Sequence, residues 1–192
     1  VSKLRSPRIL VVGDYMLDVY IYGDALRISP EAPVPVLKVR NTEFSCGGAS
    51  SVVANIAALR AKPVCLGLIG DDTNGQRLSA LLEKAGADTA GLLVTPERPT
   101  ITKKRLIGLA QHRHQQQLFR LDEESSDPLP QDISQALLKR YQSLIPDVDV
   151  VCLQDYNKGL FSRKICQEMI SRARHEGKQV LVDPAFVEDY AK

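Results

Sequence analysis

The 192-residue chain contains 44% hydrophobic and 25% charged residues, which is enough apolar content to build a folded core. Its formal net charge of +2 is too small to indicate nucleic-acid binding, and no basic stripe alternates with aromatic residues. No apolar run approaches the ~18 residues that a membrane span needs. We therefore expect a cytoplasmic protein with no nucleic-acid partner and no membrane partner.

The first expected element is a buried strand at 8–13, where apolar residues run without interruption up to a Gly-Asp turn signal. Amphipathic, strand-like segments follow at 18–23 and 34–40, with a proline-rich connection between them. Because proline cannot donate to a β-ladder, Pro33 and Pro35 place the second segment at a sheet edge or outside the main sheet.

Helices and strands alternate after residue 46. Gly47 and Gly48 open a helix whose apolar residues recur at spacings of three and four. A buried strand follows at 64–70, and Asp71 or Asp72 caps the next helix. Gly86 is suitably placed to end that helix.

Two further strands are expected at 100–109 and 116–121, with the polar stretch 111–115 as a hairpin tip. The tip contains the sequence His112-Arg113-His114. An exposed turn is favoured there over a metal site, because no third ligand lies nearby in the sequence.

The rest of the chain indicates helices at 131–144 and 162–175 and strands at 149–153 and 179–182. This alternation favours an α/β fold with a doubly wound, mostly parallel sheet flanked by helices. The segments 18–40 and 100–121 interrupt that rhythm as hairpin-like inserts.

No C-x-x-C pair occurs among the four cysteines, which are Cys46, Cys65, Cys152 and Cys166. Two of them lie inside apolar runs, which favours buried, reduced thiols over a disulfide framework or a zinc site. We expect no metal site in this chain.

Carboxylates follow three of the expected buried strands. Asp14 and Asp18 come after the first strand, and Asp155 and Asp183 come after the last two. Ligands of open α/β sheets bind at the carboxyl ends of the strands, and a carboxylate accepts hydrogen bonds from several hydroxyls, which suits a sugar. Turn or helix capping is the alternative for any one of them, but three strand ends together favour binding.

The Gly47-Gly48 pair precedes a helix, where glycines let a ligand approach unpaired backbone N–H groups. A tight turn is the alternative role of such a pair. Neither a G-x-G-x-x-G nor a G-x-x-x-x-G-K-[ST] sequence is present, which argues against a dinucleotide-binding fold and a P-loop kinase.

Basic residues cluster on the strand expected at 100–109. Strand alternation puts Lys103 and Arg105 on one face and Lys104 on the other. Two cations on one face can hold a phosphate, and a charged, solvated strand edge is the equal alternative. Lys158, three residues after Asp155, likewise either neutralises a phosphate or lies in solvent.

Several stretches match sequences of a known family, namely VVGDYMLDVYIYG at 11–23, RISPEAPVPVLKV at 27–39, CGGASSVVANIAAL at 46–59, PTITKKRLI at 99–107, QQLFRLDEE at 116–124, DYNKG at 155–159 and VLVDP at 180–184. In these stretches the chain resembles the ribokinase-like (PfkB) sugar kinases. Within that family it is most similar to the heptose 7-phosphate kinase domain of the bifunctional heptose kinase and ADP-heptose synthase. The segment at 27–39 is the most specific match.

The resemblance implies a carbohydrate kinase. Such an enzyme transfers the γ-phosphate of ATP, with Mg²⁺, to C1 of D-glycero-D-manno-heptose 7-phosphate on the way to the lipopolysaccharide core. It also implies that the inserts at 18–40 and 100–121 build a small β lid that covers the sugar and pairs with its twin in a homodimer. A ribokinase-family kinase for another sugar phosphate and a non-catalytic sugar-binding or dimerisation module are the alternatives.

The same resemblance implies roles for individual residues. The sugar hydroxyls would be bound by Asp14, Asp18, Gly47, Gly48 and Asn55. Arg105, with Lys103, would meet the 7-phosphate, and the phosphoryl-transfer region would include Asp155, Lys158 and Asp183.

The family's catalytic base belongs to a Gly-Ala-Gly-Asp motif that the resemblance places beyond Lys192. We therefore expect no catalytic residue in this chain and no turnover by the chain alone. Two positions depart from the heptose branch, since Gln154 stands where a serine is usual and Ala185 where a lysine is usual. These departures bear on contacts to phosphates and leave the expected fold unchanged.

Overall fold

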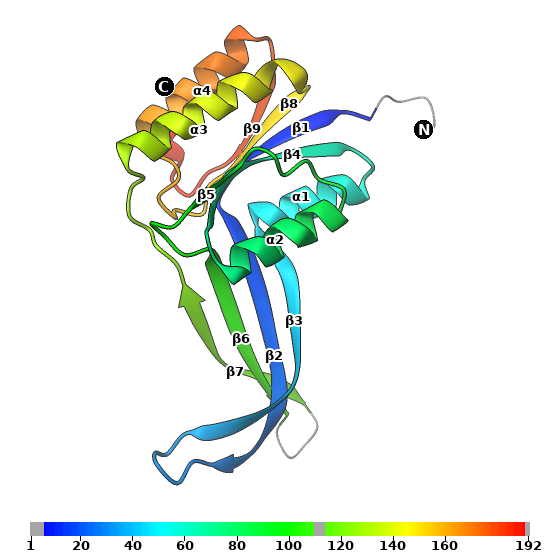
Figure 1. The fold of residues 1–192 in the computed structure, drawn as a ribbon, viewed down its shortest axis with the longest axis vertical. Helices are drawn as coiled ribbons and strands as arrows, with labels where there is room; N and C mark the ends of the chain where they lie inside the picture. The colour runs from blue at the N-terminus through cyan, green and yellow to red at the C-terminus, as the bar shows by residue number, and fades with distance from the viewer. Residues whose placement is uncertain (1–5, 110–113, 191–192) are drawn as a thin grey trace.

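The computed structural model describes residues 6–109 and 114–190, which form two β-sheets flanked by helices (Figure 1). The larger sheet is parallel and has five strands in the order β5-β4-β1-β8-β9. Its strands are β1 (Arg8–Gly13), β4 (Lys62–Gly70), β5 (Leu92–Thr95), β8 (Val150–Gln154) and β9 (Gln179–Asp183). The doubly wound α/β fold expected from the sequence is confirmed.

Two layers of helices cover the parallel sheet (Figure 1). One layer contains α1 (Ala49–Ala58) and α2 (Thr73–Lys84), and the other contains α3 (Gln131–Leu144) and α4 (Arg163–His175). Short 3₁₀ turns lie at Ile145–Asp147 and Val187–Asp189.

The central strand β1 explains why its sequence is apolar without alternation. Leu10 and Val12 pack in the core beneath α3 and α4, whereas Val11 packs in the core beneath α1 and α2. Because both faces of the strand are covered, a polar residue on either face would lose its hydration, so the run stays apolar up to Gly13.

The smaller sheet, which we call the lid, extends away from one end of the parallel sheet (Figure 1). Its order is β3-β2-β6-β7, and its strands are β2 (Tyr15–Ile28), β3 (Pro35–Gly48), β6 (Ile101–Leu109) and β7 (Gln115–Glu123). Two antiparallel hairpins, β2–β3 and β6–β7, are joined by parallel pairing of β2 with β6.

The two faces of the lid differ in chemistry because side chains alternate along each strand. Leu17 and Val19 belong to the core beneath α1 and α2. Asp18, Lys103 and Arg105 lie on the opposite side, which we call the polar face of the lid. Lys104 alternates away from them and pairs with Glu123.

The lid strands are longer than the inserts expected at 18–40 and 100–121. In the first hairpin, β2 and β3 pair without a break, from the pair Tyr15–Gly48 to the pair Tyr22–Asn41. The chain is therefore already extended directly after Asp14. The strand expected at 18–23 therefore begins earlier than predicted, at Tyr15, and Asp18 lies within the lid. The predicted edge position of the proline-flanked strand is confirmed, since β3 borders the lid.

The structure confirms the cap and the end that the sequence predicts for α2. Asp72 caps α2 by accepting a 2.7 Å hydrogen bond from the backbone N–H of Gly75, and Gly86 follows the helix end with a φ of 90°. Strand β5 was not predicted, since four residues are too few to show a period and pairing with β4 fixes their conformation.

The thiols are reduced, as the sequence predicts. All four cysteines are free, and three of them are buried, namely Cys65, Cys152 and Cys166. His112 and Arg113 lie outside the described residues, whereas His114 is exposed just before β7.

Candidate functional site

The site is built where the lid joins the carboxyl ends of the parallel strands. Asp14 directly follows β1 and is only 3% exposed. Its Oδ2 accepts hydrogen bonds from the backbone N–H groups of Tyr156 (2.8 Å) and Lys158 (3.3 Å). Burial raises the pKa of Asp14 to about 6, although these two hydrogen bonds oppose the increase. The loop after β8 thus fixes Asp14 at the centre of the sheet end.

The Gly47-Gly48 pair brings β3 against Asp14 and Asp18. A Cβ added at Gly47 would lie 2.8 Å from Oδ2 of Asp18, so only glycine leaves room for that carboxylate. Gly48 has a φ of 51°, which lets the strand turn directly into α1. The first helical N–H, that of Ala49, donates to the backbone oxygen of Asp14 at 3.0 Å.

On the polar face of the lid, Asp18 and Arg105 form an ion pair between the two hairpins. Nη1 of Arg105 donates a 2.7 Å hydrogen bond to Oδ1 of Asp18. The guanidinium also lies 5.2 Å from the ring centroid of Tyr20, a cation–π distance. An acceptor suited to hydroxyls and a donor suited to an anion therefore stand side by side.

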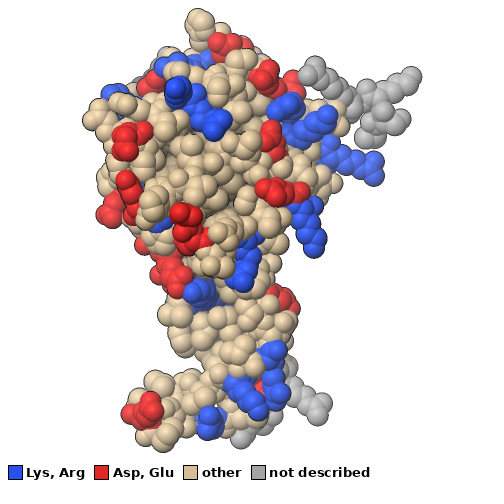
Figure 2. All heavy atoms as spheres, in the orientation of Figure 1, with Lys and Arg blue, Asp and Glu red and all other residues tan. Residues whose placement is uncertain are grey.

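Glu124, which follows β7, connects the lid to the parallel sheet. Its carboxylate accepts a 3.1 Å hydrogen bond from Nζ of Lys103 and a 2.6 Å hydrogen bond from Nζ of Lys158. Partial burial acts to raise the pKa of Glu124, but the contacts with both lysines outweigh it and hold the pKa below its ordinary value. Figure 2 shows acidic and basic groups lying together at this narrow junction.

Asp155 and Asp183 lie at neighbouring strand ends, where the backbone N–H of Asp155 donates to the backbone oxygen of Asp183 at 3.0 Å. The Asp155 carboxylate accepts hydrogen bonds from the N–H of Asn157 (2.8 Å) and the hydroxyl of Tyr190 (2.9 Å). Asp183 is exposed at the end of β9. Both residues therefore reach the edge at which Asp14 lies, as the strand order requires.

The sequence of the chain matches that of a known protein family. The sequence pattern of the pfkB family carbohydrate kinases matches residues 6–191, nearly the whole chain. This chain belongs to the pfkB family of carbohydrate kinases.

Curated relatives point to a branch of the pfkB family. The chain is 43% identical over 184 residues to "Bifunctional protein HldE" of Paramagnetospirillum magneticum, a match that covers 96% of this chain and 37% of the relative. It is 40% identical over 185 residues to the protein of the same name from Helicobacter pylori, covering 96% of this chain and 39% of the relative. The chain thus spans less than two fifths of the length of these relatives.

Solved structures support the pfkB fold. A carbohydrate kinase from Agrobacterium tumefaciens matches with a TM-score of 0.69 at 16% identity, covering 92% of this chain and 53% of that protein. The Arabidopsis thaliana ribokinase complexed with ribose and ATP matches with a TM-score of 0.62 at 14% identity, covering 93% of this chain and 54% of that protein.

The structure gathers most of the site residues expected from the sequence of this pfkB chain, but not Asn55. That residue is exposed in the second turn of α1, roughly 9 Å along the helix axis from Ala49. Ser51 lies in the first turn instead, where its hydroxyl donates to the backbone oxygen of Gly48 at 2.9 Å. Ser51 is therefore closer than Asn55 to the glycine pair.

Sequence reasoning also missed the acidic and basic residues contributed by β7 and its end, Arg120, Asp122 and Glu124. Alternation along the stretch QQLFRLDEE could have placed these three residues on one face. Their partners could not be found in this way, because Lys103 and Lys158 come from other parts of the sequence. Both lysines, expected near a phosphate or in solvent, are paired with carboxylates.

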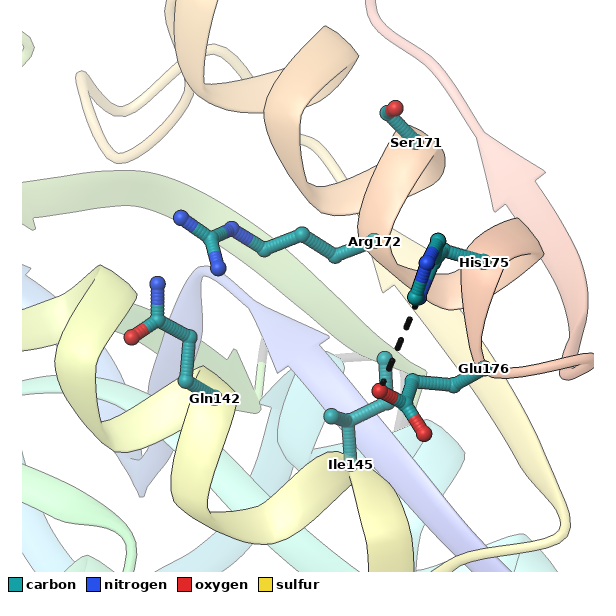
Figure 3. A pocket seen from close by; sticks show the side chains of 6 residues that line it. All are labelled: Gln142, Ile145, Ser171, Arg172, His175 and Glu176. Carbon is teal, nitrogen blue, oxygen red and sulfur yellow. Dashed lines mark ion pairs between the residues drawn. The ribbon is translucent and has the colours of Figure 1, made fainter.

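A cavity larger than the one beside Asp14 lies at α3 and α4. It has a volume of about 380 Å³, and its lining, which includes Gln142, Arg172, His175 and Glu176, comes from α3, α4 and their ends (Figure 3). Arg172 is held there by Glu168 at 2.6 Å. By contrast, the cavity beside Asp14 measures about 20 Å³, enough for one water molecule. Chemistry rather than volume therefore locates the site, because Asp14 lines the smaller cavity and none of the strand-end carboxylates lines the larger one.

Two further properties concern the described parts of the chain. Within residues 6–109 and 114–190, no three His, Cys, Asp or Glu side chains gather as a set of metal ligands. No helix in those ranges is both long enough and apolar enough to cross a membrane.

Proposed function

We propose that this chain forms the sugar-binding part of a kinase that phosphorylates D-glycero-D-manno-heptose 7-phosphate at C1, using ATP, in the pathway to the lipopolysaccharide core. The observation that carries the proposal is the ion pair of Asp18 with Arg105 beside Gly47. A sugar phosphate needs acceptors for its hydroxyls and a cation for its phosphate, and this pair offers both at one place. Membership of the pfkB family and the 43% identity to a bifunctional HldE protein support the choice of substrate.

In this proposal the sugar ring lies between the end of the parallel sheet and the lid. Asp14 and Asp18 accept hydrogen bonds from its hydroxyls, and the backbone of Gly47 and Gly48 lies against it. The lid excludes water from the phosphoryl transfer, since water would compete with the sugar hydroxyl as acceptor. Asp155, Lys158 and Asp183 lie toward the phosphoryl group that is transferred.

We include ATP and Mg²⁺ in the proposed reaction because the chain belongs to the pfkB family of carbohydrate kinases. The Arabidopsis ribokinase of similar fold was solved with ATP bound. Mg²⁺ is usually held by substrate phosphates together with one or two carboxylates, so in this proposal it enters the site with the nucleotide. We assign no residue of this chain as the catalytic base.

We also propose that the lid joins two copies of the protein in a homodimer. Large apolar side chains are about half exposed or more on the lid, among them Ile28, Val34, Val39 and Phe119. Burying them against a second lid would remove that apolar surface from water. Light scattering coupled to gel filtration tests this part, and a monomer at micromolar concentration would contradict it.

A coupled kinase assay on the complete parent protein tests the function. We expect ATP-dependent turnover of the heptose 7-phosphate and much slower turnover of fructose 6-phosphate and ribose. Preference for another sugar phosphate would assign the chain to a different ribokinase-like kinase. Saturable binding of the heptose phosphate without any turnover by the parent would indicate a binding module.

A further inference from the structure

Two segments from different parts of the chain pack against each other near the carboxyl end of β8. One is the loop after β8, at 155–159, and the other is the segment after β7, at 124–127. Gly159 has a φ of 80°, and a Cβ added there would collide with the backbone oxygen of Asp127. Only glycine therefore allows the two backbones to approach this closely.

Arg98, which lies between β5 and β6, joins these two backbones. Its Nη2 donates a 2.8 Å hydrogen bond to the backbone oxygen of Asp127, and its Nη1 donates a 3.2 Å hydrogen bond to the backbone oxygen of Lys158. Within residues 6–109 and 114–190, no carboxylate forms an ion pair with Arg98. The guanidinium therefore holds two pieces of main chain and does not neutralise a charged side chain.

The backbone around Arg98 is itself held by the end of the parallel sheet. The N–H of Thr100 donates to Oδ2 of Asp72 at 2.8 Å. A Cβ added at Gly70, the last residue of β4, would lie 2.9 Å from the backbone oxygen of Arg98. Arg98 thus reaches both segments from a fixed point beside β4.

Asp14 depends on the loop that Arg98 holds. The N–H groups of Tyr156 and Lys158 donate to its Oδ2, and Arg98 and Lys158 line the small cavity beside it. Between these two donors, Asn157 has a φ of 56°, a conformation that is uncommon for residues other than glycine. Such a conformation persists where surrounding contacts hold it, and the hydrogen bond from Arg98 to the next residue is one of these contacts.

We propose that Arg98 is a positioning residue of the sugar site, which joins the loop after β8 to the segment after β7 and thereby holds the backbone donors that orient Asp14. The action of Asp14 on sugar hydroxyls rests on the proposed function. A guanidinium suits this task because its planar fork presents several N–H donors in fixed directions, whereas lysine carries one ammonium group on a flexible chain. In this role Arg98 acts on the sugar through Asp14.

The first test measures the pKa of Asp14 in the ligand-free chain, by NMR titration of its isotope-labelled carboxyl carbon. Burial raises this pKa, as does the charge of Asp155, whereas the two backbone donors and the charge of Lys158 lower it. Arg98→Gln frees the loop and weakens the hydrogen bonds to the carboxylate. We therefore expect the pKa of Asp14 to rise from about 6 to about 7. An unchanged pKa would overturn the inference.

Gly159→Ala and Arg98→Lys separate position from charge. Arg98→Gln removes a positive charge near Asp14 as well as two hydrogen bonds, and loss of the charge alone would also raise the pKa. Gly159→Ala leaves every charge in place and forces the loop away from Asp127. Arg98→Lys keeps the charge but lacks the fork. We expect both variants to raise the pKa of Asp14, and an unchanged pKa in both would assign the effect to charge and overturn the inference.

The second test measures binding of the heptose 7-phosphate by isothermal titration calorimetry at about pH 8, where Asp14 is largely ionised even with a raised pKa. We expect Arg98→Gln to weaken binding about tenfold. In an Asp14→Ala background the same substitution should change the affinity less than about twofold, because no carboxylate is left to orient. Equal losses in the two backgrounds would show that Arg98 does not act through Asp14.

Arg172→Gln is the matched control for both tests. This arginine of α4 pairs with Glu168 on the same helix, so its substitution should change neither the pKa of Asp14 nor the affinity for the sugar. Effects as large as those of Arg98→Gln would show that loss of any arginine suffices, and would overturn the inference.

The two tests also separate this inference from the proposed function. If the unmodified chain binds the heptose phosphate and Arg98→Gln binds it equally well, the role of Arg98 is overturned and the function stands. If the unmodified chain does not bind the heptose phosphate, the proposed function is contradicted. The titration of Asp14 needs no ligand, so it then decides by itself whether Arg98 positions this carboxylate.

Discussion

The guanidinium of Arg105 donates a 2.7 Å hydrogen bond to the carboxylate of Asp18, a residue 87 positions earlier in the sequence. The two residues come from different hairpins of the lid, and parallel pairing of β2 with β6 brings them together. The contact fixes the orientation of both side chains before any ligand binds. Such preorganisation lowers the entropy lost when a sugar phosphate is bound.

Asp18→Asn tests the hydroxyl acceptor. The substitution keeps the size of the side chain but removes the charge that holds Arg105 and that, in the proposed function, accepts sugar hydroxyls. A hydrogen bond to a charged group contributes ~1.5–3 kcal/mol, so affinity for the heptose phosphate should fall about tenfold to a hundredfold. Titration calorimetry measures the affinity, and Glu123→Gln, on the opposite face of the lid, serves as control. An Asp18→Asn variant that binds as tightly as the unmodified chain would contradict the assignment.

Gly47→Ala tests the close approach of β3. The added methyl group would lie 2.8 Å from Oδ2 of Asp18, closer than ordinary van der Waals contact, so the carboxylate must move. We expect sugar affinity to fall at least as far as in Asp18→Asn, with a loss of about 1–3 kcal/mol in the free energy of unfolding. Calorimetry and thermal melting measure the two effects. Thr42→Ala, at an exposed position of the same strand, should leave both nearly unchanged, and an equally harmless Gly47→Ala would refute the steric argument.

Asp14→Asn tests the buried carboxylate. The folded state raises the pKa of Asp14 from 3.8 to about 6, so the native protein binds the proton more tightly than the unfolded chain. The contribution of this group to stability therefore falls as the pH rises through that interval, and it stays low above it. Asparagine carries no charge, so the variant should be more stable than the unmodified chain near neutral pH, by up to about 3 kcal/mol for a pKa gap of roughly two units.

Urea unfolding across the pH range measures the effect of Asp14→Asn. The gain in stability should be largest at about pH 8 and should shrink as the pH approaches the unfolded pKa. Sugar binding should weaken in the same variant, as is common when a charged site residue is neutralised. A variant that is less stable than the unmodified chain by the same amount at every pH would show that burial does not penalise this carboxylate.

Thr100→Val tests how the lid is attached to the parallel sheet. Thr100 is 1% exposed, and its hydroxyl donates to Asp72 (2.8 Å) and accepts from the N–H of Gly70 (2.9 Å). Valine fills the same space but leaves both groups without this partner, which should cost ~1–3 kcal/mol of unfolding free energy. Urea unfolding measures the change. Ser79→Ala, which removes an exposed hydroxyl bonded to Glu83, should cost less than ~0.5 kcal/mol. Equal effects of the two variants would argue against a buried anchor.

The sequence by itself determined the elements whose pattern is local. The apolar runs of β1, β4 and β8 reflect burial of both strand faces, and alternation correctly placed Lys103 and Arg105 together. Strand and helix periods depend on neighbours two to four residues away, so a single sequence displays them directly. The family motifs in the same stretches indicated a carbohydrate kinase, and membership of the pfkB family is confirmed.

Only the tertiary structure decided which charged groups meet. The contacts of Asp18 with Arg105, of Glu124 with Lys103 and Lys158, and of Asp14 with the loop after β8 all join distant parts of the chain. The four-residue strand β5 and the exposed position of Asn55 are likewise set by packing. The physical reason is that bringing distant segments together costs conformational entropy, which is offset only by packing in the shared core and by strand pairing. Neither of these depends on a local pattern in the sequence.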